Sequence, residues 1–354
     1  MRVAVVAERT EQHAETGATS RLSDLTSGLT ARDHDVTVFC SQWWEGGESV
    51  PTFDVDGVTY RMVTRDASTP GWKFAARLLR KLRQFDPDVI HAAHDPPAAV
   101  LGAGIARRLA GAPLVVAWYD DDPRTGWAEH TRDLAARTPD RVLVPSHLIE
   151  TAVLERGRSA EGTRVVPDSV DMDAIRETEP ESSADIVYSR RLDEDANVES
   201  LFLALAELRD VDWSLAVVGD GPERRTYERQ AGDFRIDDRV TFLGAQPLER
   251  RIAIMKGAQV AVHTARHAPF PREFLRALAC GCVGIAAYHA GSSAHELVET
   301  HGRGMRVSSD AELTDAIRRA ADMEHRTVDE EFARFDEDAV LDQYVACYRE
   351  LLED

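Results

Sequence analysis

The stretch Val217-Val218-Gly219-Asp220-Gly221-Pro222-Glu223 joins a short apolar run to a glycine-rich turn and then to a helical pattern. Gly219 and Gly221 permit a tight turn and the close approach of a ligand directly after a strand. The same order, an apolar strand and then a helix, recurs along the whole chain. This repetition predicts an α/β fold with parallel sheets built from βαβ units.

The repeating unit fills two halves of similar length. In the second half, apolar runs predict strands at 186–189, 214–218, 240–243, 260–263 and 283–287. In the first half, they predict strands at 3–7, 35–39, 88–91, 113–118, 141–144 and 164–166. Each half therefore reads as a Rossmann-like domain, with ligands beyond the carboxyl ends of the strands and a cleft between the two halves.

The domain boundaries follow from a change in composition. Residues 171–184 are polar, carry Pro180 and show no strand pattern, which is typical of a linker. We expect an N-terminal Rossmann-like domain at 1–172, a linker at 173–184 and a C-terminal Rossmann-like domain at 185–335. A C-terminal helix at 336–354 is expected to pack back toward the N-terminal domain.

The charge balance restricts the partners. The chain of 354 residues has a formal net charge of -20, and only three of its 42 basic residues are lysines. Such a chain is not expected to bind nucleic acid through a global field. Excess carboxylate with few lysines resembles adaptation to high salt, where self-repulsion is screened. A GC-rich genome would favour a similar composition.

The remaining composition predicts a cytoplasmic globular protein. No apolar run approaches the ~20 residues of a membrane span. The N-terminus does not resemble a signal peptide. Cys280 and Cys282 lack a second pair for a metal site, so burial is the expected reason for both.

Four segments of the second half together resemble the retaining, nucleotide-sugar-dependent glycosyltransferases of the GT-B fold, family-four type. They are residues 217–223, 240–244, 276–281 (Arg-Ala-Leu-Ala-Cys-Gly) and 291–298 (Gly-Ser-Ser-Ala-His-Glu-Leu-Val). The first half agrees more loosely, at 88–92, 113–116 and 165–171. The resemblance implies transfer of a sugar from a nucleotide diphosphate sugar to a glycan or lipid-linked acceptor. It also implies that the domain at 1–172 is the acceptor-side domain and that the domain at 185–335 binds the nucleotide sugar.

The resemblance also implies a donor site. An arginine after the first strand of the second half contacts the diphosphate in the family, and Arg191 stands at this place. The helix starting near 271–274 presents free N–H groups to an anion, and no metal is needed. Tyr119 stands where the family has a histidine. The expected catalytic residues are Arg191 and Tyr119, and the expected donor-binding residues are Gly17, Arg190, Arg191, Gly219, Asp220, Gly221, His267, Glu273, Arg276, Gly291 and Ser292.

Several polar positions of the family are replaced. Two family glutamates correspond to Ala268 and Arg276, the family lysine to Ala196 and the family histidine to Tyr119. An arginine cannot accept hydrogen bonds from ribose hydroxyls as a glutamate does. The alternative function is therefore a catalytically impaired relative that binds a glycan, a nucleotide or a partner.

Cationic residues offer compensation for these replacements. Potential cations near the expected phosphate site are His263, Arg266, His267, Arg272 and Arg276. Glu273 offers an acceptor for a sugar hydroxyl, although pairing with Arg276 at i+3 is the favoured interpretation.

Two further patterns have competing interpretations. Asp120-Asp121-Asp122 has the D-x-D spacing of metal-dependent transferases of another fold. A second Rossmann-like half does not suit that fold, so a solvated acidic loop is the favoured interpretation. His91 and His94 follow a strand, where a general base and a structural histidine are both reasonable.

The segment 72–85 combines basic residues with an apolar stripe. It contains no carboxylate, and Ala75, Leu78, Leu79, Leu82 and Phe85 repeat at helical spacing. A basic amphipathic helix is a membrane-surface pattern. Peripheral contact with the inner membrane face through Trp72, Phe74 or Phe85 is one interpretation, and packing of the stripe on the first sheet is the other.

Overall fold

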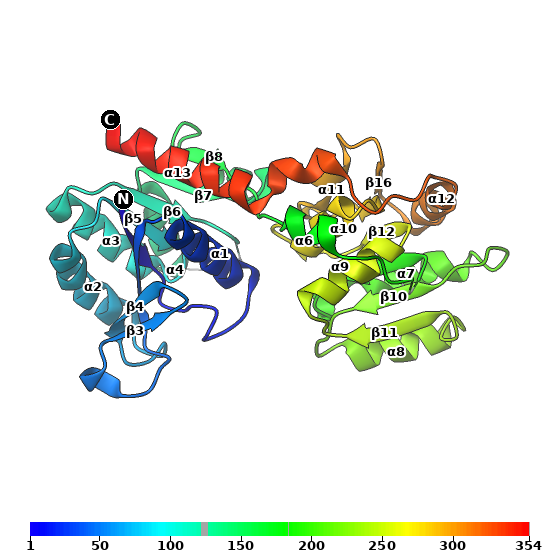
Figure 1. Ribbon diagram of the computed structural model, residues 1–354, viewed down its shortest axis with the longest axis horizontal. Helices are drawn as coiled ribbons and strands as arrows, with labels where there is room; N and C mark the ends of the chain where they lie inside the picture. The colour runs from blue at the N-terminus through cyan, green and yellow to red at the C-terminus, as the bar shows by residue number, and fades with distance from the viewer. Residues whose placement is uncertain (122–126, 183, 354) are drawn as a thin grey trace. The chain divides into compact units, whose positions relative to one another are not determined.

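The computed structural model describes residues 1–121, 127–182 and 184–353. The chain divides into two compact units (Figure 1). Unit 1 contains Met1–Pro167 together with the chain from Asp338 onward, and unit 2 contains Asp168–Glu337. The C-terminal helix α13 (Glu337–Glu353) thus belongs to the first unit.

Unit 1 is built on an eight-stranded sheet with the order β3-β4-β2-β1-β5-β6-β7-β8 in the described residues. Its strands are β1 (Arg2–Val6), β2 (Asp35–Ser41), β3 (Thr52–Val55), β4 (Val58–Thr64), β5 (Val89–Ala93), β6 (Leu114–Ala117), β7 (Arg141–Val144) and β8 (Thr163–Val165). Its helices before α13 are α1 (Gly17–Ala31), α2 (Gly71–Phe85), α3 (Pro97–Ala110), α4 (Trp127–Arg137) and α5 (His147–Glu155). All pairings are parallel except the antiparallel hairpin β3–β4.

Helices cover both faces of this sheet because its central strands are apolar on both sides. One face packs against α1 and α13, which contribute Leu25 and Tyr344. The other packs against α2, α3, α4 and α5. Gly102 of α3 lies against Ala75 of α2, where a Cβ on the glycine would stand 2.7 Å from the Ala75 Cβ. The two helices therefore need small residues at their crossing.

Unit 2 contains a six-stranded parallel sheet with the order β11-β10-β9-β12-β14-β16. Its strands are β9 (Ile186–Ser189), β10 (Leu215–Val218), β11 (Val240–Gly244), β12 (Val260–His263), β14 (Val283–Ala287) and β16 (Gly304–Val307), and a small separate sheet pairs β13 (His267–Ala268) with β15 (Gly291–Ser292). Its helices are α6 (Met172–Glu177), α7 (Val198–Ala206), α8 (Arg224–Asp233), α9 (Leu248–Gly257), α10 (Arg272–Ala279), α11 (Ala294–Val298) and α12 (Asp310–Ala321), with short 3₁₀ helices η2 (Glu194–Ala196) and η3 (Glu330–Phe335) in unit 2 and η1 (Gly47–Ser49) in unit 1.

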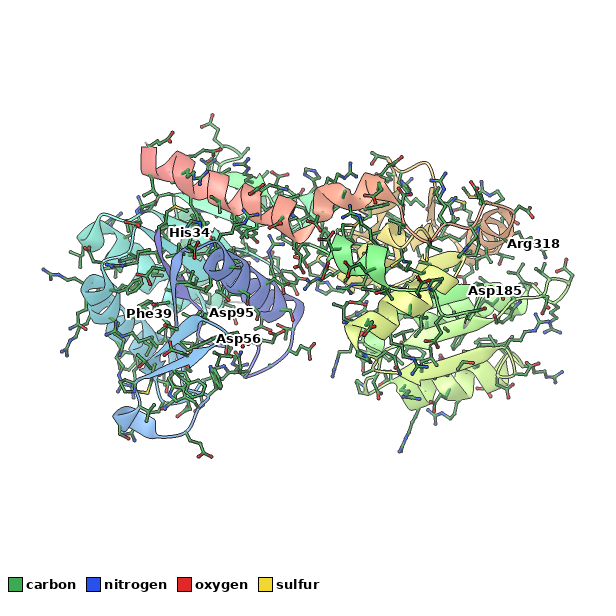
Figure 2. The ribbon with its side chains drawn as sticks, viewed as in Figure 1. His34, Phe39, Asp56, Asp95, Asp185 and Arg318 are labelled. Carbon is green, nitrogen blue, oxygen red and sulfur yellow. The ribbon has the colours of Figure 1, made fainter. Side chains whose placement is uncertain are left out.

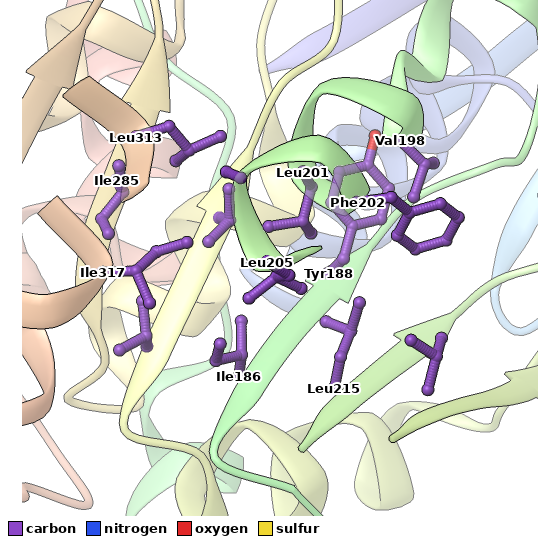
Figure 3. Packing of buried hydrophobic residues seen from close by; sticks show 14 of the residues in the cluster. Ile186, Tyr188, Val198, Leu201, Phe202, Leu205, Leu215, Ile285, Leu313 and Ile317 are labelled. Carbon is purple, nitrogen blue, oxygen red and sulfur yellow. The ribbon is translucent and has the colours of Figure 1, made fainter. Parts of the chain in front are cut away.

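The core of unit 2 lies on the two faces of this sheet. Figure 3 shows α7 packed on one face, with Leu201, Phe202 and Leu205 above strand residues such as Ile186. Helix α12 covers the same face, and its outer residue Arg318 pairs with Asp210 at 2.8 Å (Figure 2). The opposite face carries α9, α10 and α11.

The polar segment after Pro167 differs from the predicted linker. The first unit ends at Pro167, and α6 forms inside the segment because the Asp171 carboxylate accepts the Ala174 N–H at 2.8 Å as an N-cap. Met172 and Ile175 of α6 are fully buried. Two apolar positions on a six-residue helix give too little periodicity to predict it from the sequence, and the neighbouring acidic residues make the segment resemble a polar linker.

Other expectations are confirmed or extended. All four cysteines are free and buried, as expected. Helices α4, α5 and α12 were not predicted. Within the described residues, no helix has the length and apolarity needed to cross a bilayer.

His91 ties the C-terminal helix to the sheet of unit 1. Its ring is fully buried, its Nδ1 lies 2.8 Å from the Tyr348 hydroxyl, and its Nε2 has no partner among the residues that the structure describes. Burial, and then the charge of Arg21, lowers the pKa of His91 to about 3. His91 is therefore a neutral structural residue, which resolves one of the two sequence interpretations.

We expect acid to destabilise unit 1 through His91. Below pH ~6.5 the unfolded chain binds a proton at this histidine and the folded chain does not, so stability falls by about 1.4 kcal/mol per pH unit between pH ~5.5 and ~4. In the variant His91→Gln this contribution disappears. Urea unfolding at several pH values measures the slope, and equal slopes for wild type and variant would contradict the assignment.

Candidate active site

The strand order of unit 2 fixes where a ligand binds. From β9 the chain proceeds outward to β10 and β11, then returns to place β12 on the other side of β9. The crevice beyond the carboxyl ends of β9 and β12 is the topological switch point, where ligands bind in such sheets. Arg190 and Arg191 directly follow β9, and His263 ends β12.

The two arginines after β9 differ in their freedom. The guanidinium of Arg190 donates to Asp193 at 3.1 Å and to the His267 carbonyl at 3.3 Å. Arg191 is exposed, and no described residue forms a hydrogen bond or ion pair with its side chain. Arg190 thus anchors the loop, while the Arg191 guanidinium is free to meet an anionic ligand.

Gly219 and Gly221, in the segment 217–223, shape this loop. Gly219 has φ +129°, and a Cβ there would overlap with the Arg190 carbonyl. A Cβ on Gly221 would overlap with the Leu192 carbonyl. Both glycines allow backbone to lie against backbone. The exposed Asp220 accepts the Gly221 N–H at 2.8 Å, so this turn positions the arginine loop.

Glu273 lies between two guanidinium groups. Its Oε1 pairs with Arg276, as predicted, and with Arg251 at 2.7 Å, while its Oε2 lies 3.4 Å from the Ser189 hydroxyl. Burial alone would raise the pKa of Glu273, but the charges of Arg276 and Arg251 outweigh it and lower the pKa. Arg251 was missed because it reaches the cluster from α9, distant in sequence.

The potential cations predicted near the phosphate site are not all charged and available to a ligand. His263 is 4% exposed, and burial, followed by the charge of Arg190, lowers its pKa to about 3. The histidine is therefore neutral, and its buried Nε2 has no partner. Arg266 donates to the Asn197 side chain at 2.9 Å, and Arg272 donates to the Ser169 carbonyl at 2.9 Å.

The loop after β14 lies beside the segment that follows β12. His267 pairs with Gly291 and Ala268 with Ser292 in the small sheet. The Ser293 hydroxyl donates to the Pro269 carbonyl at 2.8 Å. His267, Gly291 and Ser292, predicted from separate motifs, are therefore brought together.

The replaced family positions of unit 2 are buried. Ala196 and Ala268 lie in the interior, and the Ala196 carbonyl accepts hydrogen bonds from Tyr188 and Thr264. Arg276 is buried as well and is engaged by Glu273. The N-terminus of α10 beside them has no side-chain cap.

In unit 1, the structure brings Gly17 and Tyr119 together. A Cβ on Gly17 would overlap with the Tyr119 phenol, so the ring covers the first turn of α1. The Tyr119 N–H lies 3.4 Å from Nδ1 of His94, whose pKa is lowered to about 4 chiefly by burial. Sequence reasoning missed Glu8, which follows β1 and whose buried Oε1 has no partner in the part of the chain that the structure describes.

The acidic run at 120–122 is partly accounted for. The Asp121 carboxylate binds Arg156 through two hydrogen bonds of 2.8 Å, which is a structural role. Asp122 lies outside the described residues. Among those described, no group of three or more potential ligands lies where it could hold a metal ion.

Each half of the chain matches a known protein family. Residues 16–168 match the glycosyl transferase 4-like domain, and residues 171–339 match glycosyl transferases group 1. The chain belongs to the GT-B glycosyltransferases of the family-four type. The predicted family and GT-B fold are therefore confirmed.

The relatives of this glycosyltransferase include mannosyltransferases. A GDP-mannose-dependent alpha-mannosyltransferase of Mycolicibacterium smegmatis is 28% identical over 81% of this chain and 79% of its own length. Its counterpart from Mycobacterium tuberculosis is 26% identical over 86% of this chain and 83% of its own. Sucrose-phosphate synthase from Thermosynechococcus elongatus has the same fold, with a TM-score of 0.77, 18% identity and 99% coverage of both chains.

Removal of the Glu273 charge should weaken unit 2 of this glycosyltransferase. Glu273→Gln leaves the buried Arg276 guanidinium facing Arg251 without a carboxylate, so we expect a loss of about 1–3 kcal/mol in the free energy of unfolding. Glu249→Gln, at an exposed position on α9, is the control and should change little. Denaturant titration compares the two, and equal losses would show that the cluster contributes nothing specific.

Proposed function

We propose that this glycosyltransferase transfers a hexose from a nucleotide diphosphate sugar, with GDP-mannose as the first donor to test, to a glycan or lipid-linked acceptor. The observation that carries the proposal is the free Arg191 guanidinium at the switch point of unit 2. Two relatives named for GDP-mannose, each matching over more than three quarters of the chain, support this choice of donor.

In the proposed reaction the anomeric carbon exchanges one oxygen for another. Its bond to the diphosphate breaks, a bond to the acceptor oxygen forms, and the proton of the acceptor hydroxyl passes to the departing diphosphate. Arg191 and the uncapped N-terminus of α10 stabilise the departing negative charge. His267, Gly291 and Ser292 border the donor in this proposal, and Tyr119 is the proposed catalytic residue of unit 1. Because protein cations supply the charge, we propose that activity persists in EDTA.

We also propose that Glu8 of unit 1 takes part in binding the acceptor. Within the described residues, the buried Oε1 of Glu8 has no hydrogen-bond partner, and such an atom is costly to maintain in a folded protein. Burial is the chief cause that raises the pKa of Glu8, and Asp95 adds to it against the charge of Arg9. We assign Glu8 to a hydrogen bond with an acceptor hydroxyl at the carboxyl edge of the first sheet.

The donor assignment is tested with a panel of nucleotide sugars. The proposed cytoplasmic, salt-adapted enzyme is assayed in molar KCl, and calorimetry measures binding of guanosine, uridine and thymidine diphosphate sugars. Lipid extracts supply acceptors for the transfer assay. Micromolar binding of GDP-mannose with product formation supports the proposal. Binding without turnover supports the impaired relative instead, and no binding of any donor contradicts both donor-binding proposals.

Arg191→Ala should abolish most turnover without unfolding the protein. The side chain has no partner to lose among the described residues, whereas loss of a charge-stabilising donor costs roughly 10²–10³-fold in kcat. Arg209→Ala, on the exposed surface after α7, is the matched control. An unchanged rate for Arg191→Ala, with donor binding intact, would remove Arg191 from the mechanism.

The apolar stripe of α2 is buried and is not available to a membrane. Phe74, Leu78 and Leu82 are fully buried, and the Phe85 ring packs on Phe39 at 5.5 Å, so the apolar stripe serves the core. Insertion of Phe74 was therefore the wrong expectation. Trp72, at 66% exposure, remains beside the outer basic face. We propose that this face alone makes a peripheral membrane contact.

Co-sedimentation with phosphatidylglycerol vesicles tests this contact. We expect the variant with Lys73, Arg77, Arg80 and Lys81 changed to Gln to remain in the supernatant at low salt, because it loses the cations that attract anionic lipid. A variant with Arg209, Arg225, Arg229 and Arg319 changed to Gln removes the same charge from unit 2. Equal sedimentation of both variants would contradict a specific role for α2.

A further inference from the structure

A groove lies at the amino-terminal end of the strands of the unit 1 sheet. It is a groove of about 1350 Å³ at the amino ends of β6, β7 and β8, bordered by Pro113, Arg141 and Gly162. Tyr119 and His94 stand at the carboxyl ends of β6 and β5, so the sheet separates the groove from them. The groove therefore has no part in the proposed sugar transfer.

The lining is strongly basic in a chain of net charge -20. Two carboxylates, Asp140 and Glu161, line the groove together with five arginines, which are Arg107, Arg108, Arg137, Arg141 and Arg158. Within the described residues, only one of these arginines forms an ion pair with a carboxylate: Arg107 with Asp140, at 2.9 Å. The groove therefore retains an excess of positive charge.

Backbone carbonyls hold most of these guanidinium groups in place. Arg137 donates to the Arg156 carbonyl at 2.8 Å, and Arg141 donates to the Glu161 carbonyl at 2.8 Å. Arg158 binds the Pro139 and Asp140 carbonyls at 2.7 and 2.6 Å. Neutral carbonyls orient the side chains without cancelling their charge. Little conformational entropy is then lost when an anion binds.

Exposed aliphatic side chains adjoin the arginines. Ile105 and Leu134 line the groove at 55% and 56% exposure, and Leu109, one helical turn after Ile105, is 57% exposed. Large apolar side chains clustered at such exposure mark interaction surfaces. Arginine beside aliphatic contacts is also the composition of protein–protein interfaces.

We propose that this groove docks an acidic segment of a partner protein that carries aliphatic side chains. Carboxylates of the segment would bind the fixed arginines, and its leucine-like residues would cover Ile105 and Leu134. The volume exceeds the ~300–1,000 Å³ typical of small-ligand pockets, which favours a chain segment over a metabolite. A hollow also fits an inserted segment better than the flat surface of a bilayer.

Fluorescence anisotropy with designed peptides tests the proposal on the full chain. The probe is a labelled peptide with glutamates on one helical face and leucines on the other. The groove variant Arg108→Glu/Leu134→Glu changes two exposed side chains, neither of which has a hydrogen-bond partner among the described residues. The control variant Arg225→Glu/Leu203→Glu makes the same changes on α8 and α7 of unit 2, outside the groove.

We expect the groove variant to bind the probe at least tenfold more weakly than wild type, and the control variant to bind within twofold of it. Unchanged melting temperatures show that both variants fold. Equal weakening by both variants, or equal binding of a peptide with serine in place of leucine, would overturn the proposal. Loss of vesicle binding in the groove variant alone would identify a lipid surface instead. None of these outcomes depends on sugar transfer.

Discussion

A parallel sheet that is apolar on both faces is stable only when helices cover both faces, and the architecture of this chain follows from that constraint. In unit 1, α1 alone leaves part of one face uncovered, and α13 completes it with Val345 and Tyr348. The chain must therefore return to unit 1 after unit 2 is built. Two segments cross between the units, one after Pro167 and one after Glu337.

The sequence was sufficient to predict most of the sheets. Buried parallel strands are short apolar runs bounded by polar or glycine-rich turns, and β9 and β12 appear in the structure at their predicted residues. Helix α6 was harder to predict because its six residues include only two buried positions. The Asp171 N-cap of α6 is a local signal that the acidic surroundings hide.

The candidate site was predictable in position but not in charge state. The motifs located Arg190, Arg191 and Gly219 at one edge, because residues after strands meet at the carboxyl side of a parallel sheet. Spacing along the chain does not show which side chains neutralise one another. Arg251 joins Glu273 from another helix, and His263 is neutral because the interior surrounds it. Both properties depend on tertiary contacts.

The two crossings have a consequence for how the chain is divided. The Val170 N–H donates to the Phe335 carbonyl at 2.9 Å, and Val170 also bridges Asp336, so both ends of unit 2 lie side by side. In chain topology, unit 2 is an insert within unit 1. Such an insert can be exchanged as a single cassette between relatives. The recipient protein would keep its own α13, which covers the sheet of unit 1, and would receive unit 2 of the relative.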